Sequence, residues 1–317
     1  MKHPSRGALV LGFSAVYLIW GSTYLAIKFA VVTIPPFLMA GTRQLAAGAI
    51  LYLLARRRGG QPPTGREWKA AAPIGALLLL GGNGLVSWAE MRVASGPAAL
   101  IVASVPLWMV ALSAIGARKR PPLPVIAGLA LGLGGIALLV LPASGDAHPI
   151  DRLGAGALLL AALCWSVGSL ASRRAPLPKS TLLATAMEAI AGGAALWIAG
   201  LAAGEGADLH LSAITARSAI SLVYLTLFGS VVGFSAYVWL LKVTTPERVS
   251  TYAFVNPFVA VSLGVALGGE ALTLRMASAA ALIVGAVALI LRFGRPRAAQ
   301  STSPTRAEPP EPACEAG

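Results

Sequence analysis

Long apolar segments alternate with short charged ones along almost the whole chain. Seven of them contain no Asp, Glu, Lys or Arg, and each reaches the roughly 20 residues that a membrane-spanning helix needs. Three more are weaker, because Arg43 and Glu188 interrupt two of them and the third is short. Together they predict an all-α integral membrane protein with ten transmembrane helices. The uncharged segments are 7–27, 70–89, 93–117, 121–145, 153–172, 218–241 and 249–269, and the weaker ones are 37–55, 181–203 and 276–291.

The second half of the chain repeats the first. An offset of 145 residues aligns Trp20 with Trp165, and an offset of 150 aligns Gly135 with Gly285. With five spans in each repeat, the odd number inverts the second repeat in the membrane, an arrangement typical of secondary transporters. The sequence therefore predicts two inverted five-helix repeats. The expected divisions are a cytoplasmic N-terminus (1–7), a first repeat (8–141), an outer connecting loop (142–152), a second repeat (153–293) and a disordered, polar cytoplasmic tail (294–317).

Basic side chains gather on one side of the predicted membrane. The net charge is +13, and 19 of the 25 Lys and Arg residues fall in the N-terminus, the tail and alternate loops. Only Arg92, Arg152, Arg217 and Arg275 fall in the other loops. This split follows the positive-inside rule and predicts that both termini are cytoplasmic. Nucleic acid is not expected as a partner, because no basic stripe with interleaved aromatics lies outside the predicted spans.

Several classes of enzyme and metal protein would need residues that this chain lacks. No Gly-Lys dipeptide occurs, so the chain contains no phosphate-binding loop for ATP hydrolysis. The three histidines have no spacing suited to a zinc site, so we expect neither a metal nor another cofactor. All three aspartates lie in predicted outer loops, which argues against an intramembrane enzyme with paired carboxylates. Cys164 lies within a predicted helix and Cys314 in the tail, so no disulfide is expected.

Short motifs in both halves resemble those of a known family. They are Trp-Gly-Ser-Thr-Tyr at 20–24, Pro-Pro at 35–36, Arg43, Gly-Asn-Gly at 82–84, Ala-Glu at 89–90, Ser-Gly-Pro-Ala-Ala at 95–99, the segment 250–257 and Gly-Glu at 269–270. On these motifs the chain resembles the EamA family of the drug/metabolite transporter superfamily over roughly residues 8–292, and looks most like its YedA-type exporters. The resemblance implies ten transmembrane helices, an inner (plasma) membrane location and efflux of small organic molecules. In the first repeat Arg118-Lys119-Arg120 stands in place of this Gly-Glu, so Glu270 has no symmetric partner.

Two prolines fall well inside predicted spans at corresponding places in the two repeats. Pro106 and Pro257 each remove one backbone hydrogen bond, which leaves the carbonyls of Val102 and Ala253 without their helical partners. Irregular backbone at membrane depth survives only against protein or a water-filled cavity, so the two kinks are expected to flank a central site. The alternative is helix bending for packing alone. Asn256, a polar neighbour of the second kink, favours the cavity.

Arg43 and Glu188 occupy the same repeat position with opposite charge, each about a third of the way into the membrane. An unpaired charge at that depth costs roughly 2.5 to 3.5 kcal/mol, so each residue needs a partner or water. One hypothesis is a structural ion pair between them. A second makes Glu188 a proton carrier that exchanges protons as the cavity opens to either side. Glu90, Glu270 and Lys28 lie near predicted outer helix ends and are interpreted as interfacial.

Aromatic and amide side chains supply the remaining candidates. Some aromatics fit the interfacial belt, and Tyr24 near a helix end is one that does. The deeper rings could stack on a planar or cationic substrate, and the alternative for each of them is ordinary packing. The candidates for a substrate cavity are Trp20, Tyr24, Asn83, Trp165, Tyr237, Tyr252 and Asn256.

These features favour a secondary transporter, not driven by ATP, that exports a small organic metabolite, amino acid or drug by alternating access around a midplane cavity. Its expected partners are membrane lipid, a small-molecule substrate and, if transport is coupled, protons. A gradient-independent facilitator is one alternative. A membrane sensor or scaffold without a cavity is another, and it would tolerate bulky replacements at Gly21 and Asn256. An intramembrane enzyme is the third, and it would form product without a second compartment.

Overall fold

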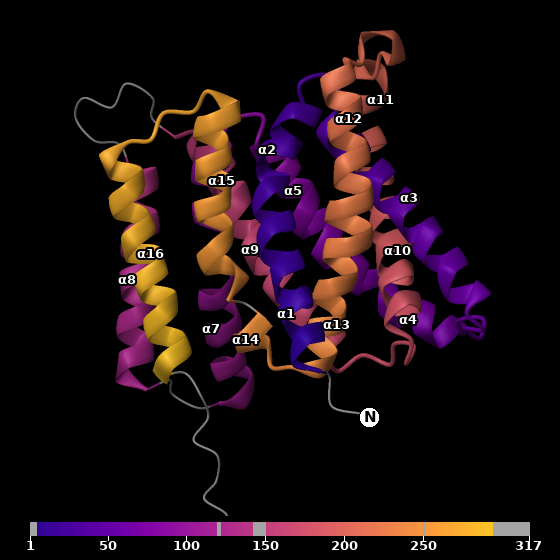
Figure 1. Ribbon diagram of the computed structural model, residues 1–317, viewed down its shortest axis with the longest axis horizontal. Coiled ribbons are helices and arrows are strands. Elements are labelled where there is room, and N and C mark those ends of the chain that lie inside the picture. The colour runs from indigo at the N-terminus through magenta and orange to yellow at the C-terminus, as the bar shows by residue number, and fades with distance from the viewer. Residues whose placement is uncertain (1–4, 119–121, 142–149, 250, 294–317) are drawn as a thin grey trace, which may run out of the picture.

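The computed structural model describes residues 5–118, 122–141, 150–249 and 251–293, and these segments are helical without a strand (Figure 1). Within these residues, eight helical segments are long and apolar enough to cross a membrane. Two further apolar helices, Val255–Gly268 and Leu274–Ile290, are shorter. The all-α membrane fold predicted from the sequence is thereby confirmed. The expected disordered tail (294–317) and most of the expected connecting loop (142–152) lie outside the described residues.

The first half forms a series of helices that lie side by side and alternate in direction (Figure 1). Its first span is a continuous helix with a wider π-helical segment, η1, in its middle, and its third span contains a longer one, η2. The elements are α1 (Arg6–Ser14), η1 (Ala15–Ile19), α2 (Trp20–Ala30), α3 (Pro36–Arg57), α4 (Gly65–Gly75), η2 (Ala76–Gly84), α5 (Leu85–Ala89), α6 (Ser95–Val102), α7 (Val105–Ala117) and α8 (Leu123–Val140).

The helices of the second half lie among those of the first, with α16 beside α8 and α10 beside α3, and α16 ends at the same end of the molecule at which α1 begins (Figure 1). Its counterpart of η2 is the π-helical segment η4, about 150 residues later in the chain. The elements are α9 (Arg152–Ser172), α10 (Thr181–Ala202), α11 (Glu205–Asp208), the short 3-10 turn η3 (Leu211–Ala213), α12 (Ala216–Tyr224), η4 (Leu225–Phe234), α13 (Ser235–Val243), α14 (Pro246–Val249), α15 (Tyr252–Gly268) and α16 (Leu274–Phe293).

Pro106 breaks its span instead of kinking a continuous helix. Helix α6 ends at Val102, and Pro106 falls in the first turn of α7. A proline there loses no hydrogen bond, because the first amides of a helix have no helical acceptor. The Ser104 carbonyl accepts from the Leu107 and Trp108 amides at 2.9 and 3.2 Å and restarts the helix. Pro257, by contrast, lies inside α15, as the sequence predicts.

Glycines let helices of the two halves approach closely. Helices α3 and α10, which carry the corresponding residues of the two repeats, pack along their length. A Cβ added at Gly75 on α4 would lie 2.4 Å from the Glu188 carbonyl oxygen on α10. A Cβ at Gly132 or Gly135 on α8 would lie 2.7 or 2.9 Å from a neighbouring side chain, so these two glycines allow close helix packing. Gly134 has no atom within 4 Å of such a Cβ and faces away from the packed helices.

Two glutamates in the second half cap helices of the first half. Glu205 on α11 accepts hydrogen bonds from the Phe37 and Leu38 amides at 3.1 and 2.9 Å, at the start of α3. Glu270, between α15 and α16, does the same for the start of α6. The first amides of a helix have no acceptor within it, so a carboxylate there satisfies them and opposes the helix dipole. The caps tie the two halves together at the end opposite the start of α1.

Candidate substrate-binding cavity

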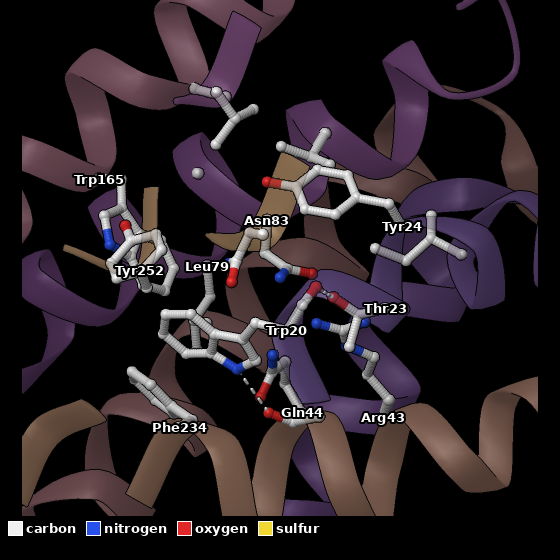
Figure 2. A pocket seen from close by; sticks show the side chains of 17 residues that line it. Trp20, Thr23, Tyr24, Arg43, Gln44, Leu79, Asn83, Trp165, Phe234 and Tyr252 are labelled. Carbon is white, nitrogen blue, oxygen red and sulfur yellow. Dashed lines mark hydrogen bonds between the residues drawn. The ribbon is translucent and has the colours of Figure 1, made fainter. Parts of the chain in front are cut away.

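A cavity of about 80 Å³ lies between helices of the two halves (Figure 2). Its wall comes mainly from α2, α3 and η2 in the first half and from α9, η4 and α15 in the second. A further wall residue is Val102, where α6 ends. Seven of the eleven candidate residues from the sequence line it, namely Trp20, Tyr24, Arg43, Asn83, Trp165, Tyr252 and Asn256. The described wall therefore gathers residues that are up to 236 positions apart in the chain.

The aromatic rings on one side of the cavity form a packed cluster around Trp20. The Trp165 and Tyr252 rings meet the Trp20 ring edge-on, each with centroids 5.4 Å apart. Trp20 Nε1 donates to the Gly229 carbonyl at 3.1 Å, which fixes the indole against η4. Edge-to-face aromatic pairs each contribute roughly 0.5 to 1.5 kcal/mol beyond the area that they bury. The cluster therefore holds its cavity-facing surfaces in one arrangement.

Tyr237 packs against this cluster but does not line the cavity. Its ring lies 4.9 Å from Trp20, centroid to centroid, and is fully buried. Its hydroxyl accepts from Trp165 Nε1 at 3.0 Å and shares a 2.6 Å hydrogen bond with the Ser169 hydroxyl. The structure thus joins Tyr237 to the aromatic candidates as a positioning residue.

Each of the three π-helical segments in the described part of the chain either lines the cavity or directly precedes a residue that does. Segment η1 ends directly before Trp20, η2 supplies Asn83, and η4 supplies Gly229 and Phe234. A π-helical turn widens the helix by one residue, shifts the side chains that follow, and occurs frequently at functional sites. These turns could not be predicted from the sequence, because their apolar composition matches that of an α-helical span.

Polar groups without partners face the same cavity. Arg43 is only 3% exposed, and its Nε and Nη1 have no hydrogen-bond acceptor among the described residues. The amide oxygens of Gln44 and Asn83 likewise have no donor there. The Asn256 amide is satisfied, because its nitrogen can donate to the Tyr17 and Tyr252 carbonyls at 2.9 and 3.2 Å. Gln44, which was not a candidate from the sequence, therefore joins Arg43 and Asn83 as a polar residue of the wall (Figure 2).

The structure does not join Arg43 to Glu188. Arg43 lines the cavity, whereas the fully buried Glu188 accepts a 2.9 Å hydrogen bond from the Ser172 hydroxyl on α9. Its second carboxylate oxygen has no partner among the described residues. The two side chains leave the tightly packed α3 and α10 in different directions, so the matching repeat positions do not produce a contact. The role of Glu188 as a proton carrier stays a prediction.

Glu270 and the partly exposed Lys28 form an ion pair, called the clasp below, instead of two separate interfacial side chains. Lys28 Nζ lies 3.2 Å from Glu270 Oε1, and the Glu270 side chain is only 7% exposed. Ser95 donates to the same oxygen from its amide and its hydroxyl, both at 2.8 Å, and the Gly96 amide donates to the other at 3.0 Å. Gly269, with φ of +67°, ends α15 in the left-handed region and turns the chain toward this contact.

Hydrogen bonding outweighs burial in setting the charge state of Glu270, which lies in the loop after α15. Burial raises the pKa of its carboxyl, but the Gly96 and Ser95 donors and the Lys28 ammonium lower it further, so the net pKa is below its ordinary value. Glu270 is therefore ionised at neutral pH. No feature of the sequence pointed to the clasp, because Glu270 has no counterpart in the first repeat.

Glu90 and Tyr24 are also buried, contrary to their interpretation as interfacial residues. Glu90 is 3% exposed, and neither carboxylate oxygen has a partner among the described residues. It lies within electrostatic range of Lys28, Glu270 and Arg43. Tyr24 lines the cavity and is 8% exposed. Helix α5, which ends next to Glu90, packs against α9. The number of residues between a side chain and the end of its helix does not reveal such packing.

Comparisons with known proteins agree with this architecture. The EamA-like transporter family matches twice, at residues 7–141 and 152–292. The inner membrane transporter YedA of Escherichia coli strain K12 is 41% identical over 289 residues, 90% of each chain. Protein PagO of Salmonella typhimurium is 26% identical over 79% of this chain and 82% of its own. A solved crystal structure with 25% identity superposes with a TM-score of 0.64 and covers 90% of this chain and 96% of that one. The chain belongs to the EamA-like transporter family.

Proposed function

We propose that the protein is a secondary transporter that exports small organic molecules across the inner membrane by alternating access around the cavity. The observation that carries this proposal is the cavity itself, whose wall combines aromatic rings with polar groups that lack partners. Buried polar groups are normally satisfied, so such groups at a cavity favour a ligand that completes them. A sensor or scaffold without transport would have no use for them.

The proposed architecture is ten transmembrane helices in two inverted repeats. The double match of the family supports the repeat, and the eight longer and two shorter apolar helices supply enough spans. Contacts support the inversion: α1 begins at one end, whereas α9 begins beside the start of α6 at the other, where Gly154 approaches Val93. The unequal distribution of Lys and Arg supports cytoplasmic termini.

The size of the cavity indicates an occluded conformation. About 80 Å³ is far below the roughly 300 to 1,000 Å³ of pockets for drug-sized ligands. Helices must therefore move for a substrate to enter. The Lys28–Glu270 clasp joins α2, α6 and the α15–α16 connection at the predicted outer end, so its rupture is the step that would open this side.

The dependence of flux on a pH gradient distinguishes a proton-coupled exporter from a gradient-independent facilitator. Buried carboxyls are the candidate groups for proton coupling. Glu188 and Glu90 are both buried with unsatisfied oxygens, and either could bind and release a proton during the cycle. Replacement of the coupling residue by Gln would remove the dependence of flux on a pH gradient and leave downhill exchange. Flux that never depends on the gradient would identify a facilitator.

The function is tested by flux into proteoliposomes, after a screen of metabolites and dyes for thermal stabilisation of the purified protein identifies a ligand. We expect saturable flux of that ligand. Ala161→Phe should abolish flux, because Ala161 on α9 is buried at the cavity wall. Leu160→Phe is the matched control, since Leu160 directly precedes Ala161 on the same helix and its own side chain is 50% exposed. Binding without flux, or equal flux in the two variants, would refute transport through this cavity.

A further inference from the structure

We propose that the substrates are organic anions with an apolar or aromatic body, and that Arg43 binds their carboxylate. This inference rests on the proposed function and names the substrate class for the same cavity. It begins from the position of Arg43 on α3, where the guanidinium lines the cavity and two of its three nitrogens have no acceptor among the described residues. A buried cation requires an anionic partner or water, because the low-dielectric interior strongly penalises an isolated charge.

No acidic side chain belongs to the described wall of the cavity. The charged group that acts on Arg43 is Glu90, which in turn lies in electrostatic range of Lys28 and Glu270, a pair already joined to each other. Glu90 acts on Arg43 but is not within ion-pair distance of it, as its two oxygens have no partner. Tyr24 and Tyr252 contribute neutral hydroxyls to the wall. The wall therefore offers a carboxylate a cation with open donors, whereas it offers an ammonium no acid.

The unsatisfied amide oxygens define a second requirement. Gln44 Oε1 and Asn83 Oδ1 can accept hydrogen bonds but have no donor among the described residues. A substrate that carries an N–H or O–H group in addition to its carboxylate would satisfy them. Trp20, Trp165 and Tyr252 form the apolar side of the cavity (Figure 2), where a planar body can stack. The aromatic rings alone are compatible with a planar or a cationic substrate. Arg43 favours the planar substrate and disfavours the cationic one.

The charges at the two ends of the molecule agree with an anionic substrate. A depression of about 640 Å³ at the predicted cytoplasmic end is lined by Arg173, Lys179 and Lys242 without an acid in its described wall. A depression of about 500 Å³ at the opposite end is lined by Glu205 and Asp208. A basic depression attracts anions, whereas an acidic one does not retain them. The distribution favours movement of an anion from the cytoplasmic side outward.

The test compares matched probes on the full-length protein purified in detergent. Each set has one ring and three head groups: phenylacetate, phenylacetamide and phenethylamine, and the corresponding acid, amide and amine of indole and naphthalene. We expect at least one acid to raise the thermal midpoint saturably, with its amide and amine at least tenfold weaker. An amine that binds better than its acid, or three acids that all fail to bind, would overturn the inference.

Variants of Arg43 assign the binding to this residue. Arg43→Gln should weaken the acid at least tenfold and leave the amide unchanged, whereas Arg43→Lys should retain part of the affinity because it keeps the charge. Glu90→Gln should strengthen the acid, because it removes the negative charge that acts on Arg43. Arg56→Gln, at an exposed site on α3, is the control and should bind like the parent. Unchanged acid binding in Arg43→Gln would refute the assignment.

Failure of this inference is distinguishable from failure of transport. Flux of amines or neutral ligands in proteoliposomes, without binding of any acid, would leave the transporter intact and refute the anion site. Binding of an acid that depends on Arg43, without flux in proteoliposomes, would support the site and refute the proposed function. Arg43→Lys guards against misfolding, because a folded variant with the charge retained must still prefer the acid to the amine.

Discussion

Replacement of Glu270 by Gln should open the predicted outer end of the transporter. The carboxylate accepts from Lys28, from the amide and hydroxyl of Ser95 and from the Gly96 amide. Glutamine keeps the shape and one acceptor oxygen, but its NH₂ group faces a donor and its charge is lost. Hydrogen bonds to a charged group contribute about 1.5 to 3 kcal/mol, and a neutral one about 0.5 to 1.5 kcal/mol.

Glu270→Gln therefore removes about 2 kcal/mol of stabilisation from the closed conformation. Most of this comes from the two amide contacts, because the partly exposed Lys28 contributes little. Since the clasp exists only while this end is closed, the loss shifts the equilibrium toward the open conformation by roughly 30-fold. The assay is the rate at which a membrane-impermeant maleimide labels Val86→Cys, a cavity position, from outside. Cys164 and Cys314, the two native cysteines, are first replaced by Ser.

We expect labelling to accelerate at least tenfold in Glu270→Gln. Asp208→Asn is the control, since it removes an exposed negative charge at the same end without breaking the clasp. An unchanged labelling rate in Glu270→Gln, or an equal acceleration in Asp208→Asn, would refute the interpretation of the clasp as an outer closure.

Three further predictions concern stability. The lowered pKa of Glu270 means that the clasp stabilises the fold above the unfolded carboxyl pKa of about 4.3 and that this contribution is lost as pH falls through the lower folded value; the thermal midpoint of Glu270→Gln should therefore fall less than that of the parent between pH 5 and pH 3, and parallel pH profiles would contradict this. Glu205→Ala removes the cap of α3 and should destabilise by about 1 to 2 kcal/mol, with Glu205→Gln intermediate in chemical unfolding, and equal stability of all three proteins would contradict the cap. Gly75→Ala should cost about 1 to 3 kcal/mol, since its Cβ would lie 2.4 Å from a backbone carbonyl of α10, whereas Gly134→Ala, with open space around it, should be neutral or stabilising in the same measurement.

The sequence predicted the membrane fold and seven residues of the cavity wall for the same physical reason. Spanning helices require long uncharged segments, and polar or aromatic side chains within such segments stand out against Ala, Leu and Val. Trp20, Asn83, Trp165 and Asn256 were identified in this way and lie around one cavity. Their substrate-binding role stays a prediction.

Interactions that depend on side-chain direction could not be predicted. Matching repeat positions suggested an Arg43–Glu188 pair, but the two side chains point to different neighbours. Lys28 and Glu270 are 242 residues apart, and only the packing of α2 beside α15 and α6 brings them together. Pro106 was read as a kink because the sequence does not reveal that the helix already ends at Val102. The π-helical turns left no compositional trace.

Two-sided accessibility of the cavity tests the central claim most directly. Val86→Cys in the cysteine-free protein would be exposed to an impermeant maleimide in right-side-out vesicles and, separately, in inside-out vesicles. The account predicts labelling from both sides, with slower labelling in the presence of a bound acid probe. Labelling from one side only, with or without the probe, would contradict alternating access.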